Sequence, residues 1–169
     1  MEEETEIPCD IRIGRDGTWY FRGMEMLRRD IVNHFYAHLR QEETGRYVIE
    51  LDNDRAYIEV EDAPFVVKAV YRGTEIGQEP ADGYILVLSD DTTEPLAPET
   101  IRIAADNVPY CRVKQGRFEA RFSPAAYYQL AGYLDYDEDR HAFYLLANGR
   151  RRYLPMCAAP AEAAERSHA

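Results

Sequence analysis

The sequence has little of what several common protein classes depend on, beginning with cysteine. The three cysteines are Cys9, Cys111 and Cys157. They are widely separated, and no two form a Cys-x-x-Cys pair. A disulfide framework or a zinc knuckle needs paired or closely spaced cysteines, so neither is expected. We expect three reduced thiols with a structural role.

Basic residues and long apolar runs are also in short supply. The 20 Lys and Arg face 31 Asp and Glu, which gives a net charge of -11. This balance argues against general binding to nucleic acids, because phosphate contacts need an excess of basic side chains. No run approaches the roughly 20 apolar residues that cross a bilayer. The amino end, Met1 to Glu4, is acidic, unlike a secretory signal. The sequence therefore predicts a cytoplasmic protein that does not bind membranes.

Motifs for common catalytic chemistry are missing too. The sequence has no Gly-x-Ser-x-Gly elbow, no phosphate-binding loop and no dinucleotide fingerprint. His34 and His38 share a helix face, as in two-histidine metal sites, but no Glu follows His34 as in zincins. We interpret both as partly buried or surface imidazoles, and we predict no catalytic residue, no metal and no cofactor.

Apolar residues are abundant and patterned as strands and helices. Alternation from Ile11 to Phe21 around Asp16-Gly17 predicts a hairpin. Residues 26–39 have apolar side chains three to five apart, which predicts a helix, and residues 46–60 predict a second hairpin. The apolar stripe predicted for the helix consists of Leu27, Ile31, Val32, Phe35, Tyr36 and Leu39.

The same order returns near the carboxyl end. Residues 109–122 predict a hairpin, Ser123 then caps a helix that begins at Pro124, and Asn148-Gly149 turns a final hairpin. The apolar stripe predicted for this second helix is Tyr127, Leu130, Ala131 and Leu134, followed by an acidic turn at residues 135–139. We infer an α+β, mostly β protein with two diverged copies of a hairpin-helix-hairpin unit.

Composition divides the chain into four parts. We expect a flexible amino terminus at residues 1–9 and an N-terminal β-rich subdomain with one helix at residues 10–76. A C-terminal β-rich subdomain with one helix follows at residues 77–157. The Gly- and Pro-rich loop that starts at Gly77 marks the boundary. Residues 158–169 lack large apolar side chains and are predicted to be disordered.

Charge is distributed unevenly along the chain. Residues 74–107 carry eight acidic residues and one basic residue, Arg102, whereas residues 108–155 carry eight basic and five acidic residues. Strand alternation points Glu119 and Arg121 to one sheet face, which Arg112 on the paired strand can join. Arg117 belongs to the same alternation, and Lys114 can also join this face. Such a row suits bidentate contact with a phosphate or carboxylate; the alternative is a solvated face on which Glu119 neutralises its neighbours.

Two adjacent carboxylates, Glu61 and Asp62, precede Pro64 at the end of the first copy. They are placed to bind a metal, to accept hydrogen bonds from a ligand, or to bond backbone N–H groups of the bend that Pro64 imposes. The pair is also the one place where a general acid and base are suggested, although the sequence supplies no nucleophile beside it. The backbone role is favoured because metal sites usually need further ligands.

Several motifs together identify a resemblance. They are Asp16 to Tyr20 with Gly23, Gly45-Arg46-Tyr47, Val60 to Phe65, Pro109-Tyr110, Glu119-Ala120-Arg121, Tyr128 and Asn148-Gly149. In this order and spacing the chain resembles the bacterial domain of unknown function 1285 (DUF1285) family from about Asp10 to Pro155. The family usually has glycines where this chain has Lys114 and Gln115, and residues 73–107 match only loosely.

The resemblance implies two β-rich subdomains, the second loosely like a pleckstrin homology fold, with a ligand site in the cleft between them. It also implies a nucleotide-like ligand and a part in signal transduction. The residues expected at that site are Glu61, Asp62, Tyr110, Arg112, Glu119 and Arg121.

Three functions therefore stay open. The first is a regulatory protein that binds a small anionic ligand. The second is a protein interaction module, as a homodimer or with another partner. The third is an enzyme that uses Glu61 and Asp62. The interaction module would use exposed aromatic residues, of which the sequence offers Tyr127, Tyr128, Tyr133 and Tyr136.

Overall fold

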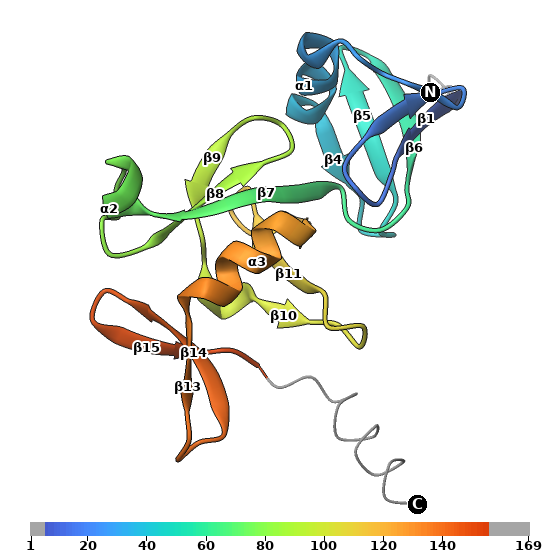
Figure 1. The fold of residues 1–169 in the computed structure, drawn as a ribbon. Helices are drawn as coiled ribbons and strands as arrows, with labels where there is room; N and C mark the ends of the chain where they lie inside the picture. Colours follow the sequence, from blue (N-terminus) through green and yellow to red (C-terminus); the bar gives the residue numbers. More distant parts are fainter. Residues whose placement is uncertain (1–5, 156–169) are drawn as a thin grey trace, which may run out of the picture. The chain divides into compact units, whose positions relative to one another are not determined.

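The computed structural model describes residues 6–155 and divides the chain into two compact units, one ending at Phe65 and one starting at Val66 (Figure 1). We call them unit 1 and unit 2 and describe each by itself. The α+β, mostly β class is confirmed, because strands dominate both units. The predicted tail at residues 158–169, Cys157 and residues 1–5 lie outside the described residues.

Unit 1 is a six-stranded sheet with one helix. Its elements are β1 (Glu6–Ile13), β2 (Trp19–Phe21), β3 (Met24–Glu25), α1 (Arg29–Ala37), β4 (Leu39–Gln41), β5 (Tyr47–Leu51) and β6 (Asp54–Val60). The strand order is β3-β2-β1-β6-β5-β4, and β1 and β6 run parallel. Residues 6–9, expected to be flexible, belong to β1, because Glu6 to Pro8 pair with β6.

The core of unit 1 is aromatic. Trp19 is 1% exposed, and its ring meets that of Tyr36 edge to face with centres 4.8 Å apart. The Tyr36 ring stacks in turn on Phe65 at 4.7 Å, and its hydroxyl donates a hydrogen bond to the Pro64 carbonyl at 3.1 Å. These contacts fix α1 on the sheet and the end of unit 1 on α1.

The first helix is shorter than the predicted span of residues 26–39. Met24 pairs with β2, and the Met26 N–H donates to the Trp19 carbonyl, so the chain stays extended until α1 begins at Arg29. Leu27, expected in the buried stripe, is consequently 77% exposed. At the other end Leu39 opens β4, because it pairs with β5.

Unit 2 combines a six-stranded sheet, a three-stranded sheet and helical segments. Its elements are β7 (Phe65–Arg72), α2 (Gly73–Ile76), β8 (Tyr84–Leu88), β9 (Thr93–Pro95), η1 (Pro98–Thr100), β10 (Arg102–Ile103), β11 (Pro109–Val113), β12 (Phe118–Phe122), α3 (Pro124–Tyr133), β13 (Leu134–Asp137), β14 (Ala142–Ala147) and β15 (Arg150–Tyr153). The larger sheet has the order β10-β11-β12-β7-β8-β9, and β13-β14-β15 form the smaller one.

The division between the units differs from the boundary expected at residue 76. β7 begins at Phe65 and lies in the middle of the larger sheet, between β12 and β8, so its contacts belong to unit 2. The loop that starts after Gly77 joins β7 to β8 and is internal to that unit. Loop composition alone did not reveal this, because the pairing of β7 with β12 is a contact between distant parts of the chain.

The predicted repeat is present in both units. In unit 1 the β1-β2 hairpin is followed by α1 and three strands, and in unit 2 the β11-β12 hairpin is followed by α3 and three strands. The first strand of each triplet was not predicted, and the segment expected as an acidic turn begins with β13. The two copies differ in pairing: β6 joins β1 in unit 1, whereas β13 to β15 form their own sheet in unit 2.

Local turn chemistry agrees with the backbone. The Ser123 hydroxyl accepts a hydrogen bond from the Ala126 N–H at 3.1 Å, so the predicted cap of α3 is present. Asn148 and Gly149 have φ of 53° and 72°, as a two-residue hairpin requires. Lys114 and Gln115 also have positive φ, 55° and 61°, a backbone conformation that glycine adopts most readily.

Within residues 6–155, no helix is both long and apolar enough to pass through a bilayer. The likeness of unit 2 to a pleckstrin homology fold stays a prediction.

Candidate functional site

Three neighbouring strands of unit 2 carry a row of two arginines and a tyrosine. Tyr110 of β11 pairs with Arg102 of β10 on one side and with Arg121 of β12 on the other. The Arg102 guanidinium lies 4.2 Å from the centre of the Tyr110 ring, and Arg121 Nη1 donates to the Tyr110 hydroxyl at 3.4 Å. Because a guanidinium is attracted to the face of an aromatic ring, Tyr110 holds cationic side chains on both flanks.

A second row lies beside the first. Arg112 lies opposite Glu119 in the register of the β11-β12 hairpin. The Glu119 carboxylate, however, accepts its hydrogen bonds from Arg102, whose Nε and Nη2 donate to its two oxygens at 2.8 and 2.6 Å. Arg112 donates from Nε and Nη2 to the Gly116 carbonyl at 3.2 and 3.0 Å. We call these five residues the arginine face: Arg102, Tyr110, Arg112, Glu119 and Arg121. It combines three guanidinium groups with one carboxylate.

Strand alternation places these side chains on the opposite sheet face from Cys111 and Val113, as the sequence indicated, and Tyr110 is itself buried on its face at 5% exposed. The arginine face holds the even-numbered side chains of β11, whereas Cys111 and Val113 are buried on the other side. On β12, Glu119 and Arg121 are half-buried, and their neighbours Phe118, Ala120 and Phe122 are buried.

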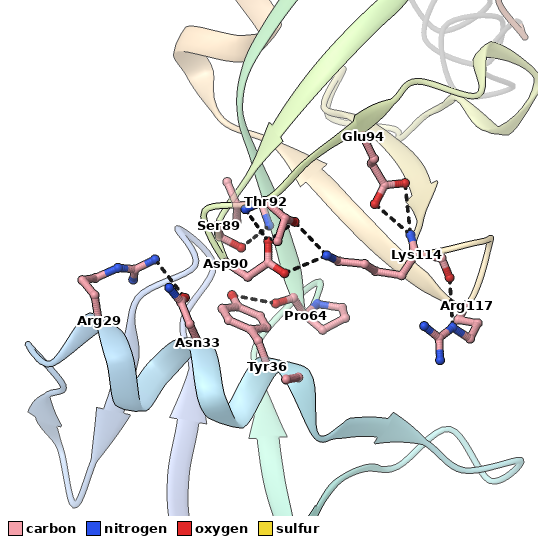
Figure 2. Close-up of polar contacts among 12 residues, drawn as sticks. Arg29, Asn33, Tyr36, Pro64, Ser89, Asp90, Thr92, Glu94, Lys114 and Arg117 are labelled. Carbon is pink, nitrogen blue, oxygen red and sulfur yellow. Dashed lines mark hydrogen bonds and ion pairs between the residues drawn. The ribbon is translucent and has the colours of Figure 1, made fainter. Parts of the chain in front are cut away.

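Lys114 and Arg117, expected on the same face, are engaged at the hairpin turn. The Lys114 ammonium lies 2.7 Å from Asp90 Oδ2 and donates to Thr92 Oγ1 at 2.7 Å. Figure 2 shows these contacts together with the Lys114 backbone N–H, which points to Glu94. Arg117 precedes β12 and donates from Nε to the Lys114 carbonyl. The Lys114 side chain therefore links the β11–β12 turn to the turn between β8 and β9, whereas Arg117 bonds within the β11–β12 turn.

In unit 1, Glu61 stabilises the first hairpin. Its Oε2 accepts hydrogen bonds from Arg12 Nη1 at 3.3 Å and from the Arg15 N–H at 3.2 Å. Its own N–H donates to the Ile13 carbonyl at 2.9 Å. The carboxylate therefore bonds a backbone N–H, as the favoured interpretation required, but that N–H belongs to the turn after β1 and not to the bend at Pro64. Asp62 follows in a half-buried bend.

The six residues predicted for a ligand site thus fall into two groups. Glu61 and Asp62 belong to unit 1, and Tyr110, Arg112, Glu119 and Arg121 lie together on unit 2. Sequence reasoning missed Arg102 as a member of the second group. The signal available was its position as the single basic residue of an acidic stretch, residues 74–107.

Each unit also has an apolar groove. In unit 1, Phe21, Met24 and Leu27 are 46%, 74% and 77% exposed and border a groove of about 650 Å³ beside Ile31 and Phe35. The sequence did not predict this surface, because Leu27 was placed in the helix stripe.

No group of three or more metal-binding side chains occurs in either unit within the described range.

The groove of unit 2 has a volume of about 390 Å³ and is bordered by Tyr127 and Phe143, among others. Of the four tyrosines predicted for an interface, Tyr127, Tyr128 and Tyr136 are exposed. Tyr133 is half-buried: its hydroxyl donates to Glu75 at 2.7 Å, and its ring packs on Tyr84. The hydrogen bond to Glu75 ties α3 to α2 within unit 2, and burial and Glu75 raise the pKa of Tyr133.

Known proteins are similar to this chain in both units. Residues 2–63 match the family model described as "Domain of unknown function (DUF1285), N-terminal domain". The crystal structure of a DUF1285 family protein from Silicibacter pomeroyi DSS-3 is similar with a TM-score of 0.71 and 27% sequence identity, covering 92% of this chain and 84% of that one. The predicted resemblance to the DUF1285 family is confirmed.

A second DUF1285 structure, from Shewanella baltica OS155, has a TM-score of 0.60 and 18% identity, covering 73% of this chain and 91% of that chain. At this identity it supports the shared DUF1285 fold alone. No protein with a curated description is similar to the chain at a significant level.

Proposed function

We propose that this DUF1285-like protein binds a small anionic ligand on the arginine face and has a regulatory, signal-transducing role. The observation that carries the proposal is the row Arg102, Tyr110 and Arg121 on three adjacent strands. Neighbouring strands lie about 4.8 Å apart, so the guanidinium groups of this row and Arg112 can contact one phosphate or carboxylate group.

The charges of the face favour an anion. Three guanidinium groups face one carboxylate, and Glu119 is used by Arg102 in a two-pronged pair. Within residues 6–155, the hydrogen bonds of the Arg112 guanidinium go to the neutral Gly116 carbonyl, which leaves its positive charge in place. Arg112 and Arg121 are therefore the predicted anion contacts, Tyr110 supplies a hydroxyl donor, and Glu119 positions Arg102.

The resemblance implies a nucleotide-like ligand in a cleft between the units, with Glu61 and Asp62 as further contacts. The proposal here needs only unit 2. Glu61 is already bonded to the first hairpin, which supports a structural role for that side chain.

The test is thermal unfolding of the full chain at low ionic strength with inorganic phosphate, pyrophosphate, AMP and ATP at millimolar concentration. A ligand that binds only the folded state raises Tm by mass action. We expect a rise that Arg112→Gln and Arg121→Gln each reduce and that the double variant abolishes. Arg150→Gln, at an exposed arginine of β15, is the matched control and should keep the rise. No rise with any of the four anions, or an equal rise in the double variant, would contradict the proposal.

A second candidate function is self-association through the groove of unit 1. Its support is the exposure of Phe21, Met24 and Leu27, because contiguous exposed apolar side chains mark interaction sites. We expect sedimentation equilibrium to show a dimer that Leu27→Glu weakens at least about tenfold, a change of roughly 1.4 kcal/mol. Ile76→Glu, at an exposed apolar residue of unit 2, is the control. A monomer at millimolar concentration would exclude this function. The enzyme alternative stays a prediction.

A further inference from the structure

The last turn of α1 brings two imidazole rings together. His34 lies in this turn, and His38 follows as the residue that ends the helix. Residues four apart share a helix face, and the two ring centres are 4.6 Å apart with an angle of 52° between the planes. His34 is exposed and His38 is half-buried, so the pair is open to solvent.

A backbone contact sets the tautomer of His38. Its Nδ1 lies 2.9 Å from the His34 carbonyl oxygen. A carbonyl only accepts hydrogen bonds, so Nδ1 carries the proton, and Nε2 of the neutral ring keeps its lone pair. Metal-binding histidines commonly have this arrangement, in which one ring N–H bonds a carbonyl and the other nitrogen coordinates the metal.

The spacing of the rings fits a shared metal ion. A metal bonded to imidazole nitrogen at about 2.0–2.1 Å lies roughly 3.2 Å from the ring centre. Two imidazoles bound at angles between right-angled and tetrahedral therefore have centres roughly 4.5–5.2 Å apart. The observed separation of 4.6 Å lies within this range.

Some groups near the histidine pair favour the binding of a metal cation, and others oppose it. The carbonyl groups at the carboxyl end of a helix carry partial negative charge, which favours cations. Arg40 opposes one, because its Nη1 donates to the Leu39 carbonyl at 2.7 Å near the same end. Asp30, two turns before His38 on this face, is held in a fork by Arg28 at 3.0 and 2.6 Å. The pair is thus suited to moderate affinity.

We propose that His34 and His38 chelate one divalent transition metal ion of the kind that imidazole prefers, Zn²⁺, Ni²⁺ or Cu²⁺. The chain supplies two nitrogen ligands, and water completes the coordination. Cu²⁺ binds most tightly, because affinity rises along the series to copper and falls at zinc. This site is independent of the arginine face, which lies on unit 2.

The experiment is titration of the full chain with Ni²⁺ and Cu²⁺, followed by calorimetry and by NMR. We expect one saturable site and selective paramagnetic broadening of the His34 and His38 signals. His34→Asn and His38→Asn should each weaken binding at least about tenfold, whereas the control His141→Asn, at an exposed histidine of unit 2, should bind as before.

Binding that survives in the double variant His34→Asn/His38→Asn, or broadening centred elsewhere, would overturn the proposal. Each variant's Tm without metal provides a folding check, which matters most for the half-buried His38. A variant that unfolds is replaced by His34→Gln, which removes the imidazole and keeps a long polar side chain.

Discussion

The side-chain oxygen of Gln129 accepts a hydrogen bond from the backbone N–H of Val70 at 2.9 Å. Gln129 lies in the middle of α3, and Val70 lies in β7, the strand at the centre of the larger sheet of unit 2. Val70 is fully buried, so its N–H depends on this side chain for a partner. The helix therefore contributes a hydrogen bond to the sheet.

Replacing Gln129 with Leu should destabilise unit 2 by about 1–3 kcal/mol, the cost of leaving a buried N–H without an acceptor. Gln129→Glu keeps an acceptor oxygen and should lose less. Urea unfolding followed by circular dichroism measures both. Equal stability of the Leu variant and the natural protein would show that the Val70 N–H finds another partner.

Two glycines of unit 2 should respond to alanine with opposite signs. A Cβ at Gly73 would collide with the Pro80 carbonyl oxygen and lie 2.5 Å from that of Gln78. Both are backbone atoms, so we expect Gly73→Ala to cost about 1–3 kcal/mol or more. A Cβ at Gly132, within α3, meets nothing within 4 Å, and Gly132→Ala should add up to about 1 kcal/mol through helix propensity.

The two alanine variants serve as controls for each other, since both remove a glycine from a helical segment. Thermal unfolding in one buffer is sufficient. A loss of stability in Gly132→Ala, or none in Gly73→Ala, would contradict the described packing.

Cys111 should make stability depend on alkaline pH. Burial first, and then Glu94 and Glu119, raise the pKa of this thiol to about 12. In the unfolded chain the thiol loses its proton near pH 9, while the folded protein keeps it. The unfolded state therefore binds fewer protons, and the free energy of unfolding falls by up to about 1.4 kcal/mol per pH unit above that point.

Urea unfolding at pH 8 and at pH 10 tests this effect. The loss between the two pH values should be smaller in Cys111→Ala than in the natural protein. Below pH 8 both proteins should show the same pH dependence. Rapid alkylation of Cys111 in the folded protein at pH 8 would contradict the buried, protonated thiol.

Glu61 allows a direct comparison of its structural and ligand-binding roles. Glu61→Gln keeps an oxygen for the Arg15 N–H and loses the charge attracted to Arg12. Because both side chains are 42% exposed, we expect a loss below about 1 kcal/mol and unchanged anion binding on unit 2. If Glu61→Gln weakens ligand binding about tenfold, the ligand-contact role predicted from the family resemblance is correct.

Local chemistry made the turns and one helix start predictable from the sequence. Asp16-Gly17 and Asn148-Gly149 turn hairpins, and Ser123 with Pro124 begins α3, because each conformation depends on residues within a few positions. The cross-strand pair Tyr110 and Arg121 followed from the same hairpin.

What the sequence did not reveal depends on pairing between distant segments. The start of α1 is set by the contact of Met26 with Trp19, and the place of β7 is set by its position between β12 and β8. Arg102 joined the arginine face through a strand of two residues, whose pairing with β11 no local pattern specifies.

The aromatic core of unit 1 has a spectroscopic consequence. Trp19 is the one tryptophan of the sequence, and within residues 6–155 its buried Nε1–H has no acceptor. An indole in such dry surroundings emits at short wavelength and shifts to the red when water reaches it. Tryptophan fluorescence therefore reports the opening of unit 1, whereas unit 2, which carries the arginine face, has no tryptophan.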